Sequence, residues 1–323
     1  MKILRNIGIV IVVVTAVLFL ANSSWLATPP KGGPTLLAHR GVHQTFSPEG
    51  LESDTCTAKR IHPPTHRYIE NTIASMRVAF DAGAKIVEFD IHPTTDDHFA
   101  VFHDWTVDCR TEGTGVTREK SLAELQSLDV GHGYTADGGQ TFPLRGHGVG
   151  LMPTLDDVLD AFPDRRFLIN VKSRDPAEGR KLGARLGKLT DRERARLTVY
   201  GHDIPLSALH EELPDVRLIS RGILMNCLLR YIGVGWTGYV PEACHNAMLL
   251  VPVNYAALLW GWPNRFLTRM QSVGTEVYVV GPYTGRDFST GIDTPDDLAR
   301  LPAGYSGGIW TNRIEAIAPL VRR

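Results

Sequence analysis

The chain has 323 residues, with 34 lysines and arginines against 35 aspartates and glutamates, and a formal net charge of -1. This balance gives no electrostatic reason to expect nucleic acid as a partner, so any recognition of phosphate must be local. The hydrophobic content of 43% is that of an ordinary globular protein, and α/β barrels commonly use this length as one domain.

Residues 1–28 differ in character from the rest of the chain. Lys2 and Arg5 precede an apolar run from Ile7 to Ala21, and no acidic residue appears before Glu49. This pattern is typical of a secretory signal peptide or of an uncleaved N-terminal membrane anchor, and both interpretations stay open. Either one places the remaining chain outside the cytosol, anchored to the inner or plasma membrane or secreted to the periplasm.

A short linker rich in proline and glycine, residues 29–34, separates this segment from one expected catalytic domain over residues 35–323. The domain begins with an apolar strand at residues 35–38 that ends in His39 and Arg40. These two side chains place a base and a planar cation at a strand exit, and arginine suits bidentate binding of phosphate.

The next stretch, residues 42–68, has few apolar residues and is expected to be a long ordered loop. A helix should follow it, with Thr72 as its N-cap and Gly83 as its C-terminal stop.

The segment from Lys85 to Asp104 carries the densest set of candidate ligands. It predicts a buried strand, a turn and a second short strand that ends in His103 and Asp104. Because side chains alternate along a strand, Glu88 and Asp90 should point to one face, roughly 6.6 Å apart. Two carboxylates on a rigid support are ligands that Mg²⁺ or Ca²⁺ prefers, and His103 adds a proton carrier beside them.

Further strands are expected at 167–173, where Asn170 and Lys172 share one face, and at five later positions: 197–201, 216–220, 237–240, 276–281 and 307–310. Helical stretches lie between several of them. This alternation predicts an α/β fold with a closed parallel barrel, in which functional groups gather at the carboxyl ends of the strands.

The four cysteines, Cys56, Cys109, Cys227 and Cys244, are compatible with an oxidising compartment. Of the three possible pairings we favour Cys56 with Cys109 and Cys227 with Cys244, because each pair lies in its own half of the chain. Four free, buried thiols are the alternative.

Residues 223–262 are apolar and rich in tryptophan, yet broken by prolines and glycines. They are interpreted either as barrel helices with buried aromatic side chains or as a second surface that faces the membrane. Six further histidines are assigned to loops, as surface or hydrogen-bonding residues: His43, His62, His66, His92, His132 and His147.

Several short motifs, taken in order, resemble the glycerophosphodiester phosphodiesterase family. They are HRG at 39–41, ENT at 70–72, ExD at 88–90, HD at 103–104, PTL at 153–155 and a lysine at 172. The resemblance runs from about Leu36 to Ile314. It implies a TIM (β/α)₈ barrel that hydrolyses glycerophosphodiesters to glycerol 3-phosphate and an alcohol.

The resemblance also implies a role for each motif residue. His39 and His103 would be the acid/base pair, Glu88 and Asp90 would bind one divalent cation, Mg²⁺ or Ca²⁺, and Arg40 and Lys172 would hold the phosphate, with Glu70 as a further acid at or beside the metal.

Three departures from the family pattern stand out. Asn170 replaces a third metal-binding glutamate, Asn312 replaces an aspartate after the last strand, and Ile69 replaces a proline. An amide oxygen can still bind a hard cation, so Asn170 is expected to be a ligand in a site with weaker metal binding. Two alternative functions remain open: a lysophospholipase D acting at the membrane surface, and a membrane-tethered binding protein with a decayed metal site.

Overall fold

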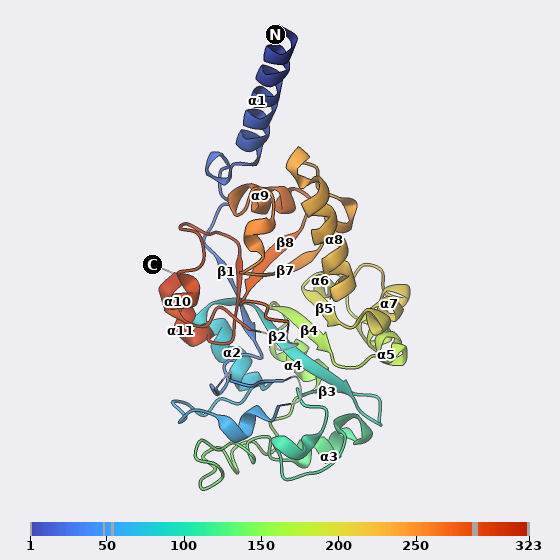
Figure 1. The fold of residues 1–323 in the computed structure, drawn as a ribbon. Coiled ribbons are helices and arrows are strands. Elements are labelled where there is room, and N and C mark those ends of the chain that lie inside the picture. The colour runs from blue at the N-terminus through green and yellow to red at the C-terminus, as the bar shows by residue number, and fades with distance from the viewer. Residues whose placement is uncertain (1, 48, 53–54, 286–289, 322–323) are drawn as a thin grey trace.

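The structure is a computed structural model that describes residues 2–47, 49–52, 55–285 and 290–321. Over these residues a parallel barrel is surrounded by helices, and one helix projects away from it (Figure 1). The barrel strands are β1 (Thr35–His39), β2 (Ala84–Pro93), β4 (Arg166–Val171), β5 (Leu197–Gly201), β6 (Arg217–Ser220), β7 (Met248–Pro252), β8 (Glu276–Val280) and β9 (Gly308–Thr311).

The strands pair in the order β6-β5-β4-β2-β1-β9-β8-β7, which nearly closes the barrel, and no pairing joins β6 to β7 in the described residues. A short strand, β3 (Phe99–Val101), pairs antiparallel with the end of β2 and lies outside the barrel path. The expected TIM-type barrel is therefore confirmed.

The helices are α1 (Lys2–Asn22), α2 (Ile73–Ala82), α3 (Leu122–Ser127), α4 (Leu155–Ala161), α5 (Pro176–Leu186), α6 (Asp191–Arg194), α7 (Asp203–Glu212), α8 (Arg221–Val234), α9 (Asn264–Ser272), α10 (Pro295–Leu298) and α11 (Ile314–Val321). Helix α2 begins and ends as predicted: Thr72 accepts a hydrogen bond from the Ser75 amide, and Gly83 has a φ of 106°. Helix α4 likewise begins after Thr154, whose side chain accepts from the Asp157 amide.

One predicted strand is wrong. After α8 the chain forms a short 3-10 turn, η5 (Gly235–Thr237), and residues 238–240 are irregular. The strand lies further on, at β7. The glycines at 235 and 238 and Pro241 interrupt the first segment, whereas Met248, Leu249 and Val251 of β7 are almost fully buried. A continuous apolar run is typical of a parallel strand covered on both faces.

The two disulfides are the favoured ones. Cys56 pairs with Cys109 at a Cα–Cα distance of 5.6 Å, and Cys227 pairs with Cys244 at 4.8 Å. The first ties the loop at residues 42–68 to the segment after β3. Residues 48, 53 and 54 of that loop lie outside the described residues.

Helix α1 stands apart from the barrel (Figure 1). It contains a stretch, Ile3–Asn22, that is long and apolar enough to cross a membrane, with a mean hydropathy of 2.5 and no part buried inside the protein. The segments that follow β1 and β3, including α3, lie at the other end of the molecule from α1 (Figure 1).

Candidate active site

The site residues meet because adjacent parallel strands end side by side. His39 on β1 is in register with Glu88 on β2, and Asp90 on β2 is in register with Asn170 on β4. Parallel strands with carboxyl ends at one face of a barrel bring such side chains together from distant parts of the chain.

Asp90 is fully buried at the centre of this group. Four side chains contact its carboxylate: Asn71 donates at 3.0 Å, Asn170 donates at 2.8 Å, Arg40 forms an ion pair at 3.2 Å and Lys172 forms one at 3.5 Å. Burial alone would raise the pKa of Asp90, but Lys172 and Arg40 outweigh it and hold this pKa well below its usual range. Asp90 is therefore a carboxylate at neutral pH.

Glu88 is equally buried and sits next to a like charge. It accepts hydrogen bonds from the Tyr200 hydroxyl at 2.5 Å and from the backbone amide of Arg40 at 3.1 Å. Burial, and then the charge of Asp90, raise the pKa of Glu88 above its usual range. A cation bound between the two buried carboxylates would reduce the repulsion between their charges.

The donor set therefore fits a hard divalent cation. Glu88 and Asp90 supply carboxylate oxygens, and Asn170 supplies an amide beside them. In the structure the Asn170 nitrogen faces Asp90, so its oxygen would reach a shared cation only after the amide rotates.

His39 is held by a short chain of polar residues. Its Nδ1 lies 2.5 Å from Oδ1 of Asn312, whose side-chain nitrogen in turn donates to Asp293 at 2.7 Å. Because the Asn312 nitrogen donates to Asp293, the Asn312 oxygen accepts from Nδ1–H of His39. Nε2 is then the unprotonated nitrogen of the ring, and it lies 3.6 Å from a Glu88 oxygen. Burial, and then Arg40, lower the pKa of His39 well below its usual value.

His103 has a charged partner instead. Its Nδ1 lies 2.6 Å from Oδ1 of Asp104, and the other oxygen of Asp104 forms an ion pair with Nε of Arg110 at 2.9 Å. Burial works to raise the pKa of Asp104, but Arg110 and His103 hold it below its usual range, so Asp104 is ionised. Burial, and then Arg40, lower the pKa of His103.

Arg110 joins two parts of the site. Besides Asp104 it contacts Glu70 at 3.1 Å, and Glu70 contacts Arg40 at 3.1 Å. Arg110 is 2% exposed and also donates to the Tyr134 hydroxyl at 2.6 Å. Burial alone would raise the pKa of Glu70, but Arg110 and Arg40 lower it.

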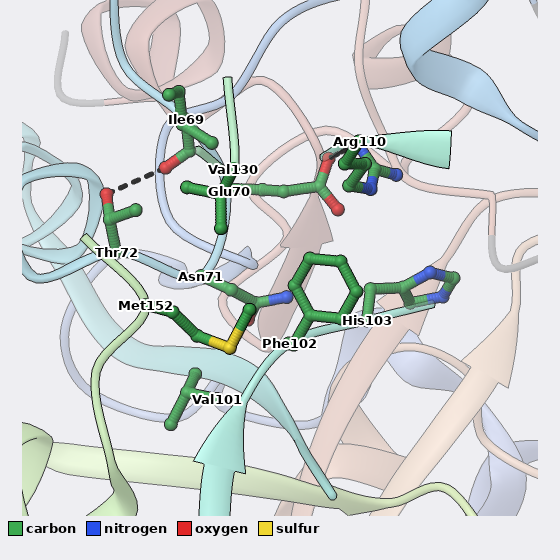
Figure 2. Close-up of a pocket in the computed structure, with 10 residues that line it drawn as sticks. All are labelled: Ile69, Glu70, Asn71, Thr72, Val101, Phe102, His103, Arg110, Val130 and Met152. Carbon is green, nitrogen blue, oxygen red and sulfur yellow. Dashed lines mark hydrogen bonds and ion pairs between the residues drawn. The ribbon is translucent and has the colours of Figure 1, made fainter. Parts of the chain in front are cut away.

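Figure 2 shows this layer, with Glu70 reaching toward Arg110 and with His103 beside Phe102. Residues that include Glu70, Asn71, His103 and Arg110 line a residual cavity of only about 10 Å³ here. These side chains are close-packed, and the volume of this cavity leaves no room for a substrate.

The comparisons with known proteins agree with this geometry. Residues 39–199 match the model of the Glycerophosphoryl diester phosphodiesterase family. A glycerophosphodiester phosphodiesterase of Caldanaerobacter subterraneus subsp. tengcongensis is 26% identical over 259 residues, which is 79% of this chain and 93% of that protein. This chain belongs to the glycerophosphoryl diester phosphodiesterase family. It is thus an enzyme of the phosphoric diester hydrolase class.

Other known proteins are similar to this chain over a shorter stretch of sequence, or are similar to it in fold alone. A Bacillus subtilis glycerophosphodiester phosphodiesterase is 34% identical over 125 residues, which is 37% of this chain and 41% of that one. The corresponding domain of an uncharacterized Mycobacterium tuberculosis protein superposes with a TM-score of 0.63 at 16% identity, covering 90% of this chain and 100% of that one.

A structure of an Oleispira antarctica phosphodiesterase in complex with the product sn-glycerol-3-phosphate has a TM-score of 0.55 and 16% identity. It covers 89% of this chain and 97% of that one. These two similarities support the fold of this phosphodiesterase.

The structure brings together every residue that the sequence singled out for the phosphodiesterase site: His39, Arg40, Glu70, Glu88, Asp90, His103, Asn170 and Lys172. Their chemical roles stay predictions. Three supporting residues escaped the sequence analysis, Asn71, Tyr200 and Arg110. Asn71 lies within the ENT motif and Arg110 follows Cys109, so those two had a local signal.

Two details of the sequence analysis are corrected. Of the two alternatives for His43 and His92, surface or hydrogen-bonding residues, the second holds: both are buried, at 4% and 0% exposure, and Nδ1 of His43 contacts the Gln44 carbonyl at 2.9 Å. His92 lies in β2 and not in a loop; it accepts from Arg118 at 3.2 Å and contacts the His103 carbonyl at 3.3 Å. The second short strand ends earlier than expected: β3 stops at Val101, and His103 and Asp104 lie in the chain beyond it.

Proposed function

We propose that this enzyme hydrolyses glycerophosphodiesters to glycerol 3-phosphate and an alcohol, with His39 and His103 as its acid/base pair. The observation that carries the proposal is that both histidines, each with a partner on Nδ1, lie around one buried carboxylate, Asp90, at the carboxyl end of the barrel. The names of the relatives support the same substrate class.

The partners of the two histidines support a proposal for which is the acid and which the base. His39 contacts a neutral amide, Asn312, and its pKa lies well below the usual value, so it is the proton acceptor and takes a proton from water or from a glycerol hydroxyl. His103 contacts the ionised Asp104, which favours the protonated ring against the burial and the Arg40 charge that lower the pKa of His103, and we assign it as the donor of the proton to the leaving oxygen. A positioned proton transfer is worth roughly 10² to 10⁴ in rate.

Arg40 and Lys172 are proposed to bind the phosphate. In the absence of substrate both contact Asp90, and the side chain of Lys172 is the more accessible of the two, at 20% exposure against 11%. Both side chains offer positive charge where negative charge grows in the transition state.

Glu88, Asp90 and Asn170 are proposed to hold one divalent cation, Mg²⁺ or Ca²⁺, with Glu70 supporting the site through Arg40. When bound, the cation would neutralise charge on the phosphate oxygens. With an amide in place of one carboxylate, Glu88 and Asp90 carry more of the binding.

Residues 1–28 are proposed to be a membrane anchor and residues 35–323 the catalytic domain, outside the cytosol. The two disulfides favour an oxidising compartment. An uncleaved α1, with 21 residues, is long enough to span a bilayer.

The position of α1 favours a water-soluble substrate over a lysophospholipid. The segments that surround the site lie at the other end of the molecule from α1 (Figure 1), so an anchored enzyme would turn its active site toward the aqueous phase. Lysophospholipase D activity remains the competing function because a membrane helix brings the enzyme close to such lipids.

The test is hydrolysis of glycerophosphocholine and lysophosphatidylcholine by the full chain with added Mg²⁺ or Ca²⁺. We expect turnover of the first, abolished by chelation, by His39→Ala and by Glu88→Ala. Activity that survives both substitutions would contradict the site assignment, and faster turnover of the lysophospholipid would establish the competing function. Binding without turnover of either would indicate a binding protein.

A further inference from the structure

An exposed apolar surface lies beside the end of α1. Its side chains come from the second half of α8, from η5, and from the turn η7 (Ala256–Leu258) and the chain just beyond it. They are Leu229, Ile232, Val234, Trp236, Leu258 and Trp260. We call it the apolar face. Leu258 is 61% exposed, Trp236 42% and Trp260 41%, which is unusual for side chains of this size in water.

The apolar face is one continuous surface. The indole nitrogen of Trp260 donates to the Ile232 carbonyl at 2.7 Å, and the Tyr231 hydroxyl donates to the Trp260 carbonyl at 2.8 Å. These bonds hold the segment after β7 against α8.

The same surface is fixed to the end of α1. Asn22 donates to the Trp236 carbonyl at 2.8 Å, and Arg269 donates to both Asn22 at 3.0 Å and the Gly235 carbonyl at 3.0 Å. Arg269 also donates to the Ala21 carbonyl at 3.3 Å, so it caps the last turn of α1. The orientation of α1 relative to the barrel is therefore set by specific contacts.

A cavity of about 810 Å³ separates α1 from the apolar face. It is lined on one side by Thr15, Leu18 and Phe19 of α1, and on the other by side chains that include Trp236, Leu258 and Trp260. An open cavity with walls this apolar is unfavourable in water, and lipid chains would fill it.

The length of α1 sets the depth of this cavity in a membrane. At 1.5 Å per residue, the 21 residues of α1 measure roughly 31 Å, about the thickness of the hydrocarbon core. The whole helix is needed to cross, so Thr15, Leu18 and Phe19 must lie within the bilayer or at its outer boundary. The residues across the cavity then lie at the same depth.

The charge around the apolar face fits an anionic lipid surface. From Val216 to Thr275 the sequence has one acidic residue, Glu242, and five arginines, Arg217, Arg221, Arg230, Arg265 and Arg269. Arg217 forms an ion pair with Glu276 at 2.7 Å, which leaves four arginines against one acid. Basic residues near a membrane are attracted to anionic headgroups, and tryptophan favours the interface.

We propose that the apolar face inserts into the outer interface of the bilayer that α1 crosses, in contact with anionic phospholipids. The barrel then rests on the membrane through α8, η5 and η7, with its active-site end toward the water. This inference rests on the proposed anchoring by α1, and its test is independent of catalysis.

The test uses the full chain in vesicles of phosphatidylcholine and phosphatidylglycerol that carry lipids brominated near the glycerol, which quench nearby tryptophans. The chain has 6 tryptophans. The double variant Trp236→Phe/Trp260→Phe should lose most of the quenched emission and leave that of Trp25, whereas Trp105→Phe should leave the quenching unchanged. Leu258→Asp, at an exposed position, should also reduce the quenching by lifting the apolar face off the lipid.

Equal quenching in the wild type and in Trp236→Phe/Trp260→Phe, with Trp25→Phe abolishing it, would overturn the proposal and keep the anchor. No quenching in any variant would overturn the anchor as well. Hydrolysis of glycerophosphocholine by the same samples reports separately on the proposed reaction.

Discussion

At the scale of single residues, the two histidines differ in what holds them. His39 contacts the amide of Asn312, with Asp293 one step behind, whereas His103 contacts the carboxylate of Asp104 directly. A carboxylate raises the basicity of an imidazole more than an amide does, because it stabilises the protonated ring. This difference in partners is the basis for proposing His39 as the proton acceptor and His103 as the proton donor.

Asn312→Asp should therefore shift the pH dependence of hydrolysis. The new carboxylate raises the pKa of His39, and a base must be unprotonated to act, so the acidic limb of the kcat/KM profile moves to higher pH. The matched variant Asn312→Asp/Asp293→Asn keeps a single acid in the pair and should show the same direction of shift. A profile that is unchanged in both would assign the acidic limb to another group.

Asp104→Asn should reduce turnover by roughly 10² or more, since an amide no longer favours the protonated form of His103. Glycerophosphocholine binding, measured as KM, should change much less than kcat. A change confined to KM would place Asp104 in substrate binding instead of in the support of His103.

Arg110→Lys tests whether the geometry of the guanidinium matters. Lysine keeps the positive charge, but its single ammonium group cannot contact Asp104 and Glu70 together as the planar guanidinium does. We therefore expect a clear loss of kcat, with binding of the divalent cation retained. Arg166→Lys is the control, because Arg166 pairs with Glu276 at the opposite ends of the strands and should affect stability alone. Equal kcat losses in both variants would mean that Arg110 acts only through folding.

At the scale of elements, the segment after β3 carries His103, Asp104 and Arg110, and the only regular structure in the described chain between Asp104 and Arg110 is the short 3-10 turn η3 (Val107–Cys109). The Cys56–Cys109 disulfide ends next to Arg110 and ties this segment to the preceding loop. The Cys227–Cys244 disulfide joins α8 to the turn η6 (Glu242–Cys244) and lies away from these residues.

The two disulfides should therefore have different effects when removed. Chain-entropy estimates give about 4 kcal/mol of stability for the separation of 53 residues and about 3 kcal/mol for that of 17. Cys56→Ala/Cys109→Ala should lower both stability and kcat, whereas Cys227→Ala/Cys244→Ala should lower mainly stability. Melting curves and initial rates measured well below both melting temperatures check this; equal kcat in the two variants would contradict it.

At the scale of the whole molecule, the barrel separates two surfaces. The catalytic groups gather where β1, β2 and β4 end, while the apolar face and α1 lie at the other end of the molecule (Figure 1). With α1 as the proposed anchor, this arrangement would keep the enzyme at a membrane and turn its site toward substrates in solution.

An uncleaved α1 should keep the full chain in the membrane fraction after washing with high salt, because apolar burial does not depend on charge. Detergent should release it. Soluble protein whose mature N-terminus lies beyond residue 20 would show that α1 is a cleaved signal.

The sequence alone predicted the barrel, the favoured disulfide pairing, the long apolar helix at the N-terminus and which candidate site residues lie together; their roles stay predictions. Each depends on local signals: the alternation of strand and helix, the motif spacings, and the apolar run before the first acidic residue. The strand wrongly predicted at 237–240 shows the limit of such signals. Tyr239 and Val240 beside a glycine resemble a short strand, but the segment that is buried as a strand is β7.

Tertiary structure decided what those residues contact. Tyr200 meets Glu88 from a strand 112 positions away, Asn312 meets His39 across 273 positions, and Arg110 joins Glu70 to Asp104. No local pattern encodes these pairs, because they arise only when strands distant in sequence end at the same edge of the barrel. The same holds for the apolar face: the sequence left its side chains open between core and surface, and the structure places them, exposed, beside the end of α1.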